Sequence, residues 1–193
     1  MKTSKPLSLL TALFTALAVL SGSIAAPLLC RPFYYAHIGP MGLAEYVGLT
    51  AEEIRQAFDQ VMDFCLGLRP DFAAGVLPWS QSGADHFADV RRLFLLDLWV
   101  LGLSLAALAA AFVLCRRIGL RPYCFRGRGP GFWAAVGLGA AFLIVGGLAA
   151  LDFERAFAVF HALFFPGKTN WLFDWRTDPI ILFMPEEFFR NCA

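Results

Sequence analysis

Three long apolar segments constrain the fold of this chain more than any other feature of its sequence. They cover residues 7–29, 93–115 and 132–151, and Asp97 is the one charged residue within them. Roughly 20 apolar residues suffice for a helix to cross a bilayer, and these segments are rich in Leu and Ala, which favour helices. The chain is also 59% hydrophobic and only 16% charged. We therefore predict an all-α membrane protein with three transmembrane helices in a single membrane domain, residues 1–193.

The basic residues predict the orientation of the spans. Residues 116–131, between the second and third spans, carry five arginines and no carboxylate, and Lys2 and Lys5 precede the first span. Cytoplasmic loops are enriched in Lys and Arg, so the N-terminus and this loop are predicted to be cytoplasmic. Residues 30–92 and 152–193 then form outer segments. Topology explains the basic loop, and the net charge is only +1, so no nucleic-acid partner is expected.

The first span has an alternative interpretation as a cleaved signal peptide. Two lysines precede its apolar core, and residues 23–26 resemble a cleavage site. The apolar stretch is long for a signal peptide, and Pro27 directly after Ala26 is a poor partner for cleavage. A retained span is therefore favoured.

The outer segment 30–92 is expected to begin irregularly and then to become helical. Residues 32–35 are Pro-Phe-Tyr-Tyr, and His37 follows in the same irregular stretch, where we assign it no role. Thr50 and Glu53 have capping-box spacing, which predicts a helix start at Thr50. A second helix is predicted to begin near Ala84 and to continue into the second span.

The outer C-terminal segment combines aromatic and ionisable residues. A helix is expected to continue outward from the third span as far as Phe164 and to end at the Pro166–Gly167 pair. Aromatic side chains settle among lipid headgroups, whereas ionisable groups are costly there unless they pair or react. We therefore predict an active site at the membrane surface. Asp174, Asp178 and Glu186 are expected to hold the outer segment together rather than to react.

Two histidines are candidates for chemistry, each with a structural alternative. His86 and Asp89 are three residues apart and share a helix face. An Asp in that position can fix the tautomer of the His and raise its basicity, as a general base needs. The alternative is that His86 and Asp89 form a solvated surface pair, and their spacing alone favours this alternative. His161 lies among several phenylalanines and is either a packing residue or a functional one.

Several common catalytic constellations do not occur in the sequence. It contains no GxSxG, HExxH or HxxxxD motif, and three scattered histidines predict no metal site. No cofactor is predicted. The five cysteines lack CxxC spacing, which leaves a disulfide between Cys30 and Cys65 open. A non-catalytic membrane protein, binding lipid or a partner protein through its outer aromatic segment, is the alternative to an enzyme.

Short sequence blocks resemble one bacterial family in order along the whole chain. The family is that of the integral membrane lipoprotein intramolecular transacylases, Lit. The blocks are residues 85–90 (DHFADV) and 160–165 (FHALFF), Trp171, residues 173–174 (FD), Asp178 and residues 184–189 (MPEEFF). Together these blocks are fairly specific, although each one alone is weak.

The resemblance implies a reaction at the outer face of the bacterial plasma membrane. One acyl chain of a diacylglyceryl lipoprotein moves from the glycerol sn-2 oxygen to the amino group of the N-terminal Cys. His86 corresponds to the catalytic histidine and His161 to the second one, with Asp89 expected to orient His86. The partners are the diacylated lipoprotein and membrane lipid. The family pattern also implies a fourth span beyond Phe189, whereas this sequence ends at Ala193.

The substrate itself would supply both the nucleophile and the ester, so the enzyme needs no Ser or Cys nucleophile. A tetrahedral oxyanion requires a hydrogen-bond donor, for which His161, Trp171 or a backbone amide would serve. The residues predicted to bind substrate are Trp171, Phe160, Phe164 and Tyr35.

Overall fold

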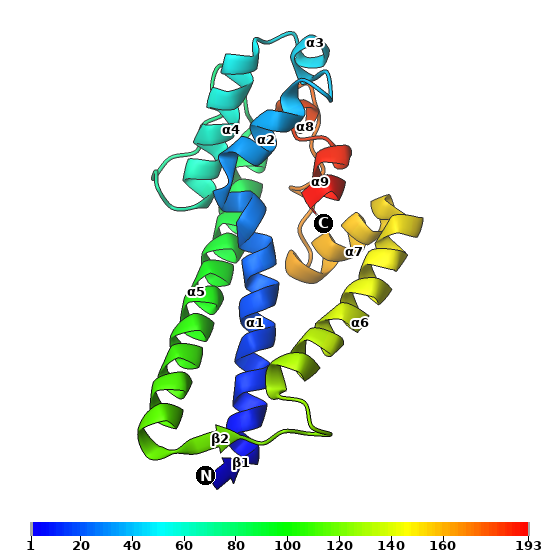
Figure 1. Ribbon diagram of the computed structural model, residues 1–193. Coiled ribbons are helices and arrows are strands. Elements are labelled where there is room, and N and C mark those ends of the chain that lie inside the picture. Colours follow the sequence, from blue (N-terminus) through cyan, green and yellow to red (C-terminus); the bar gives the residue numbers. More distant parts are fainter. Residues whose placement is uncertain (1, 193) are drawn as a thin grey trace. The chain divides into compact units, whose positions relative to one another are not determined.

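A computed structural model describes residues 2–192, and its contacts divide the chain into two compact units. We call residues 2–25 and 96–151 the span unit, and residues 26–95 and 152–192 the site unit. Helices dominate both units (Figure 1). Three of the helices are long and apolar enough to cross a membrane. The predicted fold class, an all-α membrane protein with three spans, is therefore confirmed.

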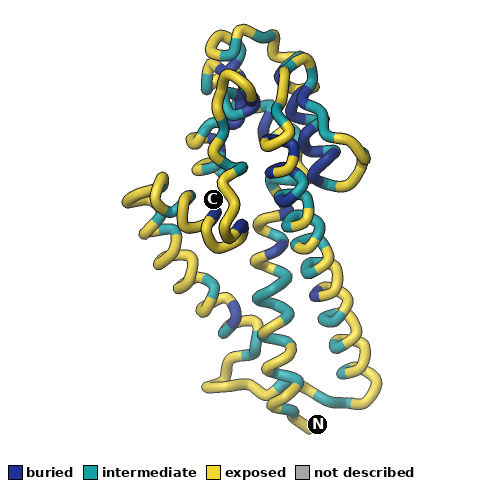
Figure 2. Tube along the Cα trace, turned by 180° about the vertical axis from the view of Figure 1, so that it is seen from behind, coloured by how far each residue is buried: buried dark blue, intermediate teal, exposed yellow. Residues whose placement is uncertain are grey.

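The three spanning helices are α1 (Lys5–Leu29), α5 (Gln81–Ile118) and α6 (Pro130–Leu151). The apolar residues of these helices are largely exposed, and Figure 2 colours most of each span as exposed or intermediate. Such exposure suits contact with lipid rather than with water. Within the span unit, Ser21 of α1 and Ser104 of α5 are buried. A Cβ built on Gly22 would lie 3.8 Å from the Leu101 side chain. Small residues thus let α1 and α5 pack closely, as is usual for helices in membranes.

A short parallel strand pair, which the sequence analysis did not predict, closes one end of the span unit. Strand β1 (Lys2–Ser4) pairs with β2 (Leu120–Pro122), and Lys2 lies opposite Leu120. The Ser8 hydroxyl also donates to the carbonyl of Tyr123 at 2.7 Å. Residues 2–8 are therefore fixed beside the basic connection between α5 and α6. The side of the membrane that this end faces stays a prediction.

The site unit is built from short helices around an aromatic and aliphatic core. The core includes Tyr34, Ile54, Val61, Ile180 and Phe183, each at most 1% exposed. The helices are α2 (Arg31–Ile38), α3 (Leu43–Val47), α4 (Ala51–Cys65), the first turns of α5, α7 (Phe153–Phe164), α8 (Ile180–Phe183) and α9 (Glu186–Cys192). Because the core combines α2 and α4 with α8, the two sequence segments of the site unit fold together.

The start of α4 confirms the predicted capping box. The Thr50 hydroxyl accepts from the amide of Glu53, whose carboxylate accepts from the amide of Thr50. The predicted irregular start of the outer segment is wrong, because residues 31–38 form α2. Pro32 lies in the first turn, where its missing N–H has no helical partner to lose.

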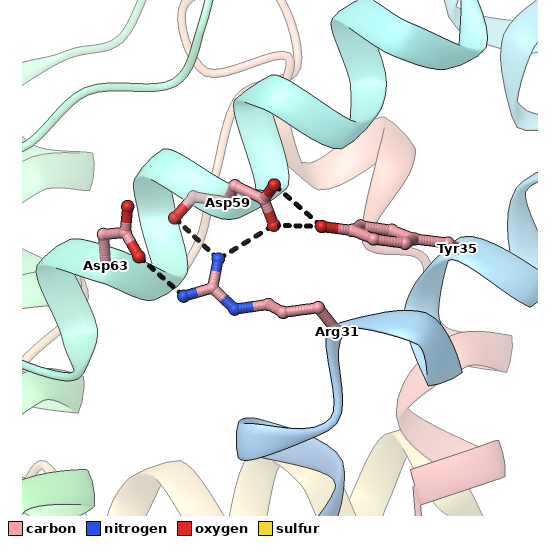
Figure 3. A network of polar contacts seen from close by, with 4 residues as sticks. All are labelled: Arg31, Tyr35, Asp59 and Asp63. Carbon is pink, nitrogen blue, oxygen red and sulfur yellow. Dashed lines mark hydrogen bonds and ion pairs between the residues drawn. The ribbon is translucent and has the colours of Figure 1, made fainter.

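A charged network fastens α2 to α4 (Figure 3). The Arg31 guanidinium bonds the carboxylates of Asp59 at 2.8 Å and Asp63 at 2.7 Å. Tyr35 donates its hydroxyl to Asp59 at 2.7 Å. Asp59 and Asp63 are one helical turn apart on α4, so a single guanidinium can bind both. The cysteines form no disulfide in residues 2–192; Cys30 is exposed and Cys65 is buried.

The expected continuous helix from the third span to Phe164 is wrong. Helix α6 ends at Leu151, and α7 begins at Phe153 after a break at Asp152, whose φ is −154°. The Asp152 carboxylate accepts from the amide of Arg155 at 2.9 Å, so it acts as an N-cap for α7. The predicted end at the Pro166–Gly167 pair is close to the observed end at Phe164.

Asp178 holds the C-terminal segment against the start of α5. Its carboxylate accepts from the Ser80 amide at 2.7 Å and from the Thr177 hydroxyl at 2.9 Å, and the residue is only 4% exposed. Ser80 in turn accepts from the amide of Gly83. This is the structural role predicted for Asp178. A Cβ on Gly83 would collide with the Asp178 carboxylate and lie 3.1 Å from Phe173 Cε1.

We expect Gly83→Ala to destabilise the site unit by about 1–3 kcal/mol, the usual cost of overpacking a close contact. Gly39→Ala is the matched control, because its φ of −69° is helical and no atom lies within 4 Å of a Cβ built there. Thermal unfolding of the detergent-solubilised variants measures the difference. Equal melting temperatures for the two variants would contradict the close contact at Gly83.

Candidate active site

The first turns of α5 and the last turn of α7 bring two histidines together. Helix α5 has 38 residues, or about 57 Å at 1.5 Å per residue, which exceeds the roughly 30 Å hydrocarbon thickness. Its apolar stretch begins at Leu93, so His86 precedes the span. The centroid of the His86 ring lies 5.6 Å from that of His161 on α7. The two side chains are 5% and 4% exposed.

Aromatic rings enclose both imidazoles. His86 lies within 6 Å, centroid to centroid, of Phe87, Phe165 and Phe173. His161 lies 4.2 Å from Phe157 and stacks on Trp171 at 4.4 Å with an interplanar angle of 27°. These apolar surroundings exclude water from the rings, so the neutral forms of both imidazoles are favoured.

Hydrogen bonding distinguishes the two histidines. Nδ1 of His161 lies 2.8 Å from the Phe157 carbonyl, which can only accept, so Nδ1 carries the hydrogen and the Nε2 of the neutral ring is an acceptor. Nδ1 of His86 is buried and has no hydrogen-bond partner within residues 2–192. Of these two rings, His86 is therefore the one whose Nδ1 binds no other described residue.

The environment lowers the pKa of both imidazoles. For His86 the pKa falls from 6.5 to about 4, chiefly through burial and then through repulsion from His161; Asp89 opposes this shift by attraction. For His161 burial also lowers the pKa, against the bond to the Phe157 carbonyl, which raises it. Both rings are thus neutral at pH 7, as a base that is to accept a proton must be.

Asp89, which was predicted to orient His86, forms no hydrogen bond with that ring among the described residues. In the described part of the chain its carboxylate instead binds Lys168 Nζ at 2.5 Å, with longer contacts to Asn170 at 3.4 Å and Arg92 at 3.5 Å. Burial would raise the pKa of Asp89, but these partners, Lys168 first, lower it. Asp89 is therefore ionised and acts on His86 through its charge rather than by orienting the ring.

The four predicted substrate-binding residues have different positions. Trp171 stacks on His161, but its indole N–H donates to the Lys168 carbonyl at 3.1 Å and is not free to bind an oxyanion. Phe160 and Phe164 lie on α7, 45% and 47% exposed, with rings 4.7 Å apart. Tyr35 belongs to the Arg31 network on α2, where its hydroxyl is bonded to Asp59.

Two site residues, Lys168 and Asn170, were missed by the sequence analysis. They belong to the loop after the Pro166–Gly167 pair and bind Asp89, which precedes them by about eighty positions. A lysine beside the aromatic blocks, in a segment with several carboxylates, was the available signal. No group of three His, Cys, Asp or Glu residues suited to a metal ion occurs within residues 2–192.

Comparisons with known proteins agree on one family. The family model described as "Lipoprotein intramolecular transacylase Lit" matches residues 9–189. A solved structure of this membrane-integral protein from Bacillus cereus has a TM-score of 0.83 and 23% identity, covering 97% of this chain and 84% of that one. A structure of its histidine-to-arginine variant has a TM-score of 0.77 and 23% identity, covering 97% of this chain and 80% of that one. A structure of its histidine-to-alanine variant has a TM-score of 0.77 and 22% identity, covering 97% of this chain and 82% of that one. No curated protein matches. At such identities the solved structures establish the fold.

The lowered histidine pKa predicts that the folded protein loses stability in mild acid. In the unfolded chain His86 has a pKa near 6.5, whereas the folded value is about 4. Between these values the unfolded state binds more protons, so stability falls as the pH drops from 6.5 towards 4. We expect His86→Phe to reduce the loss of melting temperature between pH 7 and pH 5. The control is His37→Phe, at a ring that packs against Phe33 and Phe188; equal slopes for all three proteins would contradict the assignment.

Proposed function

The chain belongs to the lipoprotein intramolecular transacylase family, Lit, and we propose that it rearranges a diacylglyceryl lipoprotein by O-to-N acyl transfer. One acyl chain leaves the glycerol sn-2 oxygen and is joined to the amino group of the N-terminal Cys. The product is a lyso-form lipoprotein, N-acylated and S-monoacylglycerylated. The family match supports acyl transfer on lipoproteins in general, and the finer choice of oxygen and nitrogen is part of the proposal.

The pairing of His86 with His161 is the observation that carries this proposal. Two buried imidazoles lie 5.6 Å apart, and the Nδ1 of one of them has no partner among residues 2–192. Such a pair is costly to maintain in an apolar environment. A purely structural histidine would satisfy both nitrogens or be replaced by an apolar ring. An unoccupied ring nitrogen is what a general base needs in order to reach a substrate proton.

The proton balance of the reaction suits a neutral imidazole. Attack of the neutral amine on the ester carbonyl forms a C–N bond and leaves a positively charged nitrogen, which is far more acidic than the free ammonium. His86 accepts that proton. The C–O bond to the glycerol then breaks, and the imidazolium returns the same proton to the departing oxygen. No proton is gained or lost overall, so no further reactant is needed.

The second imidazole limits the charge of the pair. Protonation of one ring disfavours protonation of the other, because like charges at this distance repel. The pair therefore carries at most one positive charge during the reaction, and a protonated His86 readily gives up its extra proton. His161 would steady the protonated neighbour through its Nε2 lone pair, since Nδ1 is engaged by the Phe157 carbonyl.

Binding and proximity would supply the rest of the catalysis. The amine and the ester belong to the same lipidated cysteine, so their reaction is already intramolecular. Holding them in a near-attack geometry can contribute roughly 7–11 kcal/mol. The exposed Phe160 and Phe164 on α7 offer an apolar surface for the acyl chains. Because the Trp171 N–H and His161 Nδ1 are engaged, we assign oxyanion binding to a backbone amide.

We place the site at the outer face of the bacterial plasma membrane, with the N-terminus in the cytoplasm. The support is the charge asymmetry of the chain: the connection between α5 and α6 is basic, whereas carboxylates are confined to the site unit and Asp97. The alternative function is non-catalytic binding of lipid or a partner protein. The exposed apolar side chains Val159, Phe160, Leu163 and Phe164 of α7 favour it.

The decisive experiment compares His86→Ala with His37→Ala in cells that express a reporter lipoprotein. Loss of a general base lowers a rate by about 10²–10⁴-fold, so we expect His86→Ala to abolish the N-acylated lyso-form and His37→Ala to retain it. The rearrangement leaves the total mass unchanged, so tandem mass spectrometry of the N-terminal peptide is the measurement. An unmodified N-terminus with wild-type protein confirmed in the membrane would favour the non-catalytic alternative.

The pH dependence of the rate gives an independent check. The substrate amine has a pKa of about 7.7–8, so below pH 7 only a small fraction is reactive. His86, with a pKa of about 4, stays neutral throughout pH 5–7. We expect the logarithm of kcat/KM to rise with a slope near one over this range. A slope near two would show that an imidazole also titrates there, contrary to the burial of the pair.

A further inference from the structure

A polar cleft of about 470 Å³ opens in the site unit beside the histidine-bearing turn of α5. On the α5 side it is lined by Ser82, Asp85, Asp89 and Arg92, and on the other side by residues 168–170. Positions 82, 85, 89 and 92 are three or four residues apart, so they form one stripe along the helix. His86 follows Asp85 directly and therefore lies next to this stripe. The cleft adjoins the candidate active site.

The cleft offers balanced polar groups rather than a net charge. Arg92 and Lys168 are cationic, Asp85 and Asp89 are carboxylates, and Ser82 and Thr169 carry hydroxyls that both donate and accept. The Lys168 side chain is 45% exposed and the Arg92 side chain 80%, so both retain donors for a ligand. A phosphate group is best bound by unopposed cations, and the two carboxylates oppose it here.

A peptide backbone matches these groups better. Each residue other than Pro presents one N–H donor and one carbonyl acceptor. The carboxylates, hydroxyls and cations of the cleft can pair with both. Ten residues of helix separate Ser82 from Arg92, which corresponds to roughly 15 Å at 1.5 Å per residue. That length accommodates about four residues of extended peptide at 3.3–3.6 Å each.

We propose that this cleft binds the polypeptide segment that directly follows the lipidated cysteine of the substrate. The inference rests on the proposed function, which provides a substrate with lipid at one end and peptide at the other. The cysteine links the two parts, so a peptide site has to lie within a few ångströms of the reacting amine. The aromatic surroundings of the histidines would thus bind the lipid part of the substrate, and the polar cleft would bind its peptide part.

Equilibrium binding to protein in nanodiscs tests this division without requiring turnover. The two probes are a fluorescent diacylglyceryl pentapeptide and a fluorescent diacylglyceryl cysteine amide that lacks the peptide. We expect the unsubstituted protein to bind the pentapeptide about tenfold more tightly, a difference of about 1.4 kcal/mol. Ser82→Tyr, at an exposed position in the cleft, should remove this preference and leave binding of the cysteine amide unchanged.

Two further variants keep the test decisive. Thr169→Tyr obstructs the opposite wall and should have the same effect as Ser82→Tyr. Gln56→Tyr, at an exposed position of α4, is the matched control and should retain the preference. An equal loss for both probes would show that the cleft merely supports the lipid site, and unchanged binding in both cleft variants would show that no peptide enters it. Either result overturns the proposal.

A third assay addresses a phospholipid headgroup. Phosphatidylglycerol vesicles that displace the pentapeptide, with displacement lost in Ser82→Tyr, would assign the cleft to lipid phosphate and overturn the peptide assignment. If the protein prefers the pentapeptide but performs no acyl transfer, the peptide assignment of the cleft stands and the proposed reaction is refuted. Failure of the peptide assignment can therefore be told apart from failure of the proposed reaction.

Discussion

The contact between Asp178 and the first turn of α5 is the interaction on which the geometry of the site depends. His86 belongs to a helix from the first sequence segment of the site unit, and its aromatic neighbours Phe165 and Phe173 belong to the second. The carboxylate of Asp178 binds the Ser80 amide beside Gly83, where no side chain intervenes. A charge-assisted bond at a helix start is strong because the helix dipole favours an anion there. The position of one imidazole relative to its surroundings follows from this contact.

Burial and charge then have different roles around the histidines. Aromatic rings keep the imidazoles neutral, and the ionised Asp89 lies at the margin with its own partner, Lys168. A direct hydrogen bond from Asp89 would have raised the basicity of the His86 ring and fixed its tautomer. Here the buried His86 Nδ1 is left unpaired in the described chain, and the nearby charges act at longer range. The protein thereby keeps His86 as a weak base in an environment without water, next to the solvated polar groups around Asp89 and Lys168.

The sequence predicted those elements that depend on residues close together in the chain. The spans followed from their apolar length, and the start of α4 followed from the Thr50–Glu53 spacing. Pro32 and its aromatic neighbours misled the prediction for α2, because proline is tolerated in a first turn. The N-cap at Asp152 had a recognisable signal that was overlooked. The bond from Lys168 to Asp89 and the strand pair β1–β2 join distant residues, and no local pattern encodes them. The proximity of His86 to His161, 75 positions apart, was permitted by spacing but suggested only by family resemblance.

The discontinuity of the site unit has a consequence for biogenesis. Its core needs Ile54 and Val61 from the first segment and Ile180 and Phe183 from the second, with residues 96–151 of the span unit translated in between. During synthesis the apolar faces of the first segment therefore stay uncovered until α8 leaves the ribosome. Such delayed assembly exposes aggregation-prone surface. The two imidazoles can therefore meet only after α7 has left the ribosome, long after the turn of α5 that bears His86.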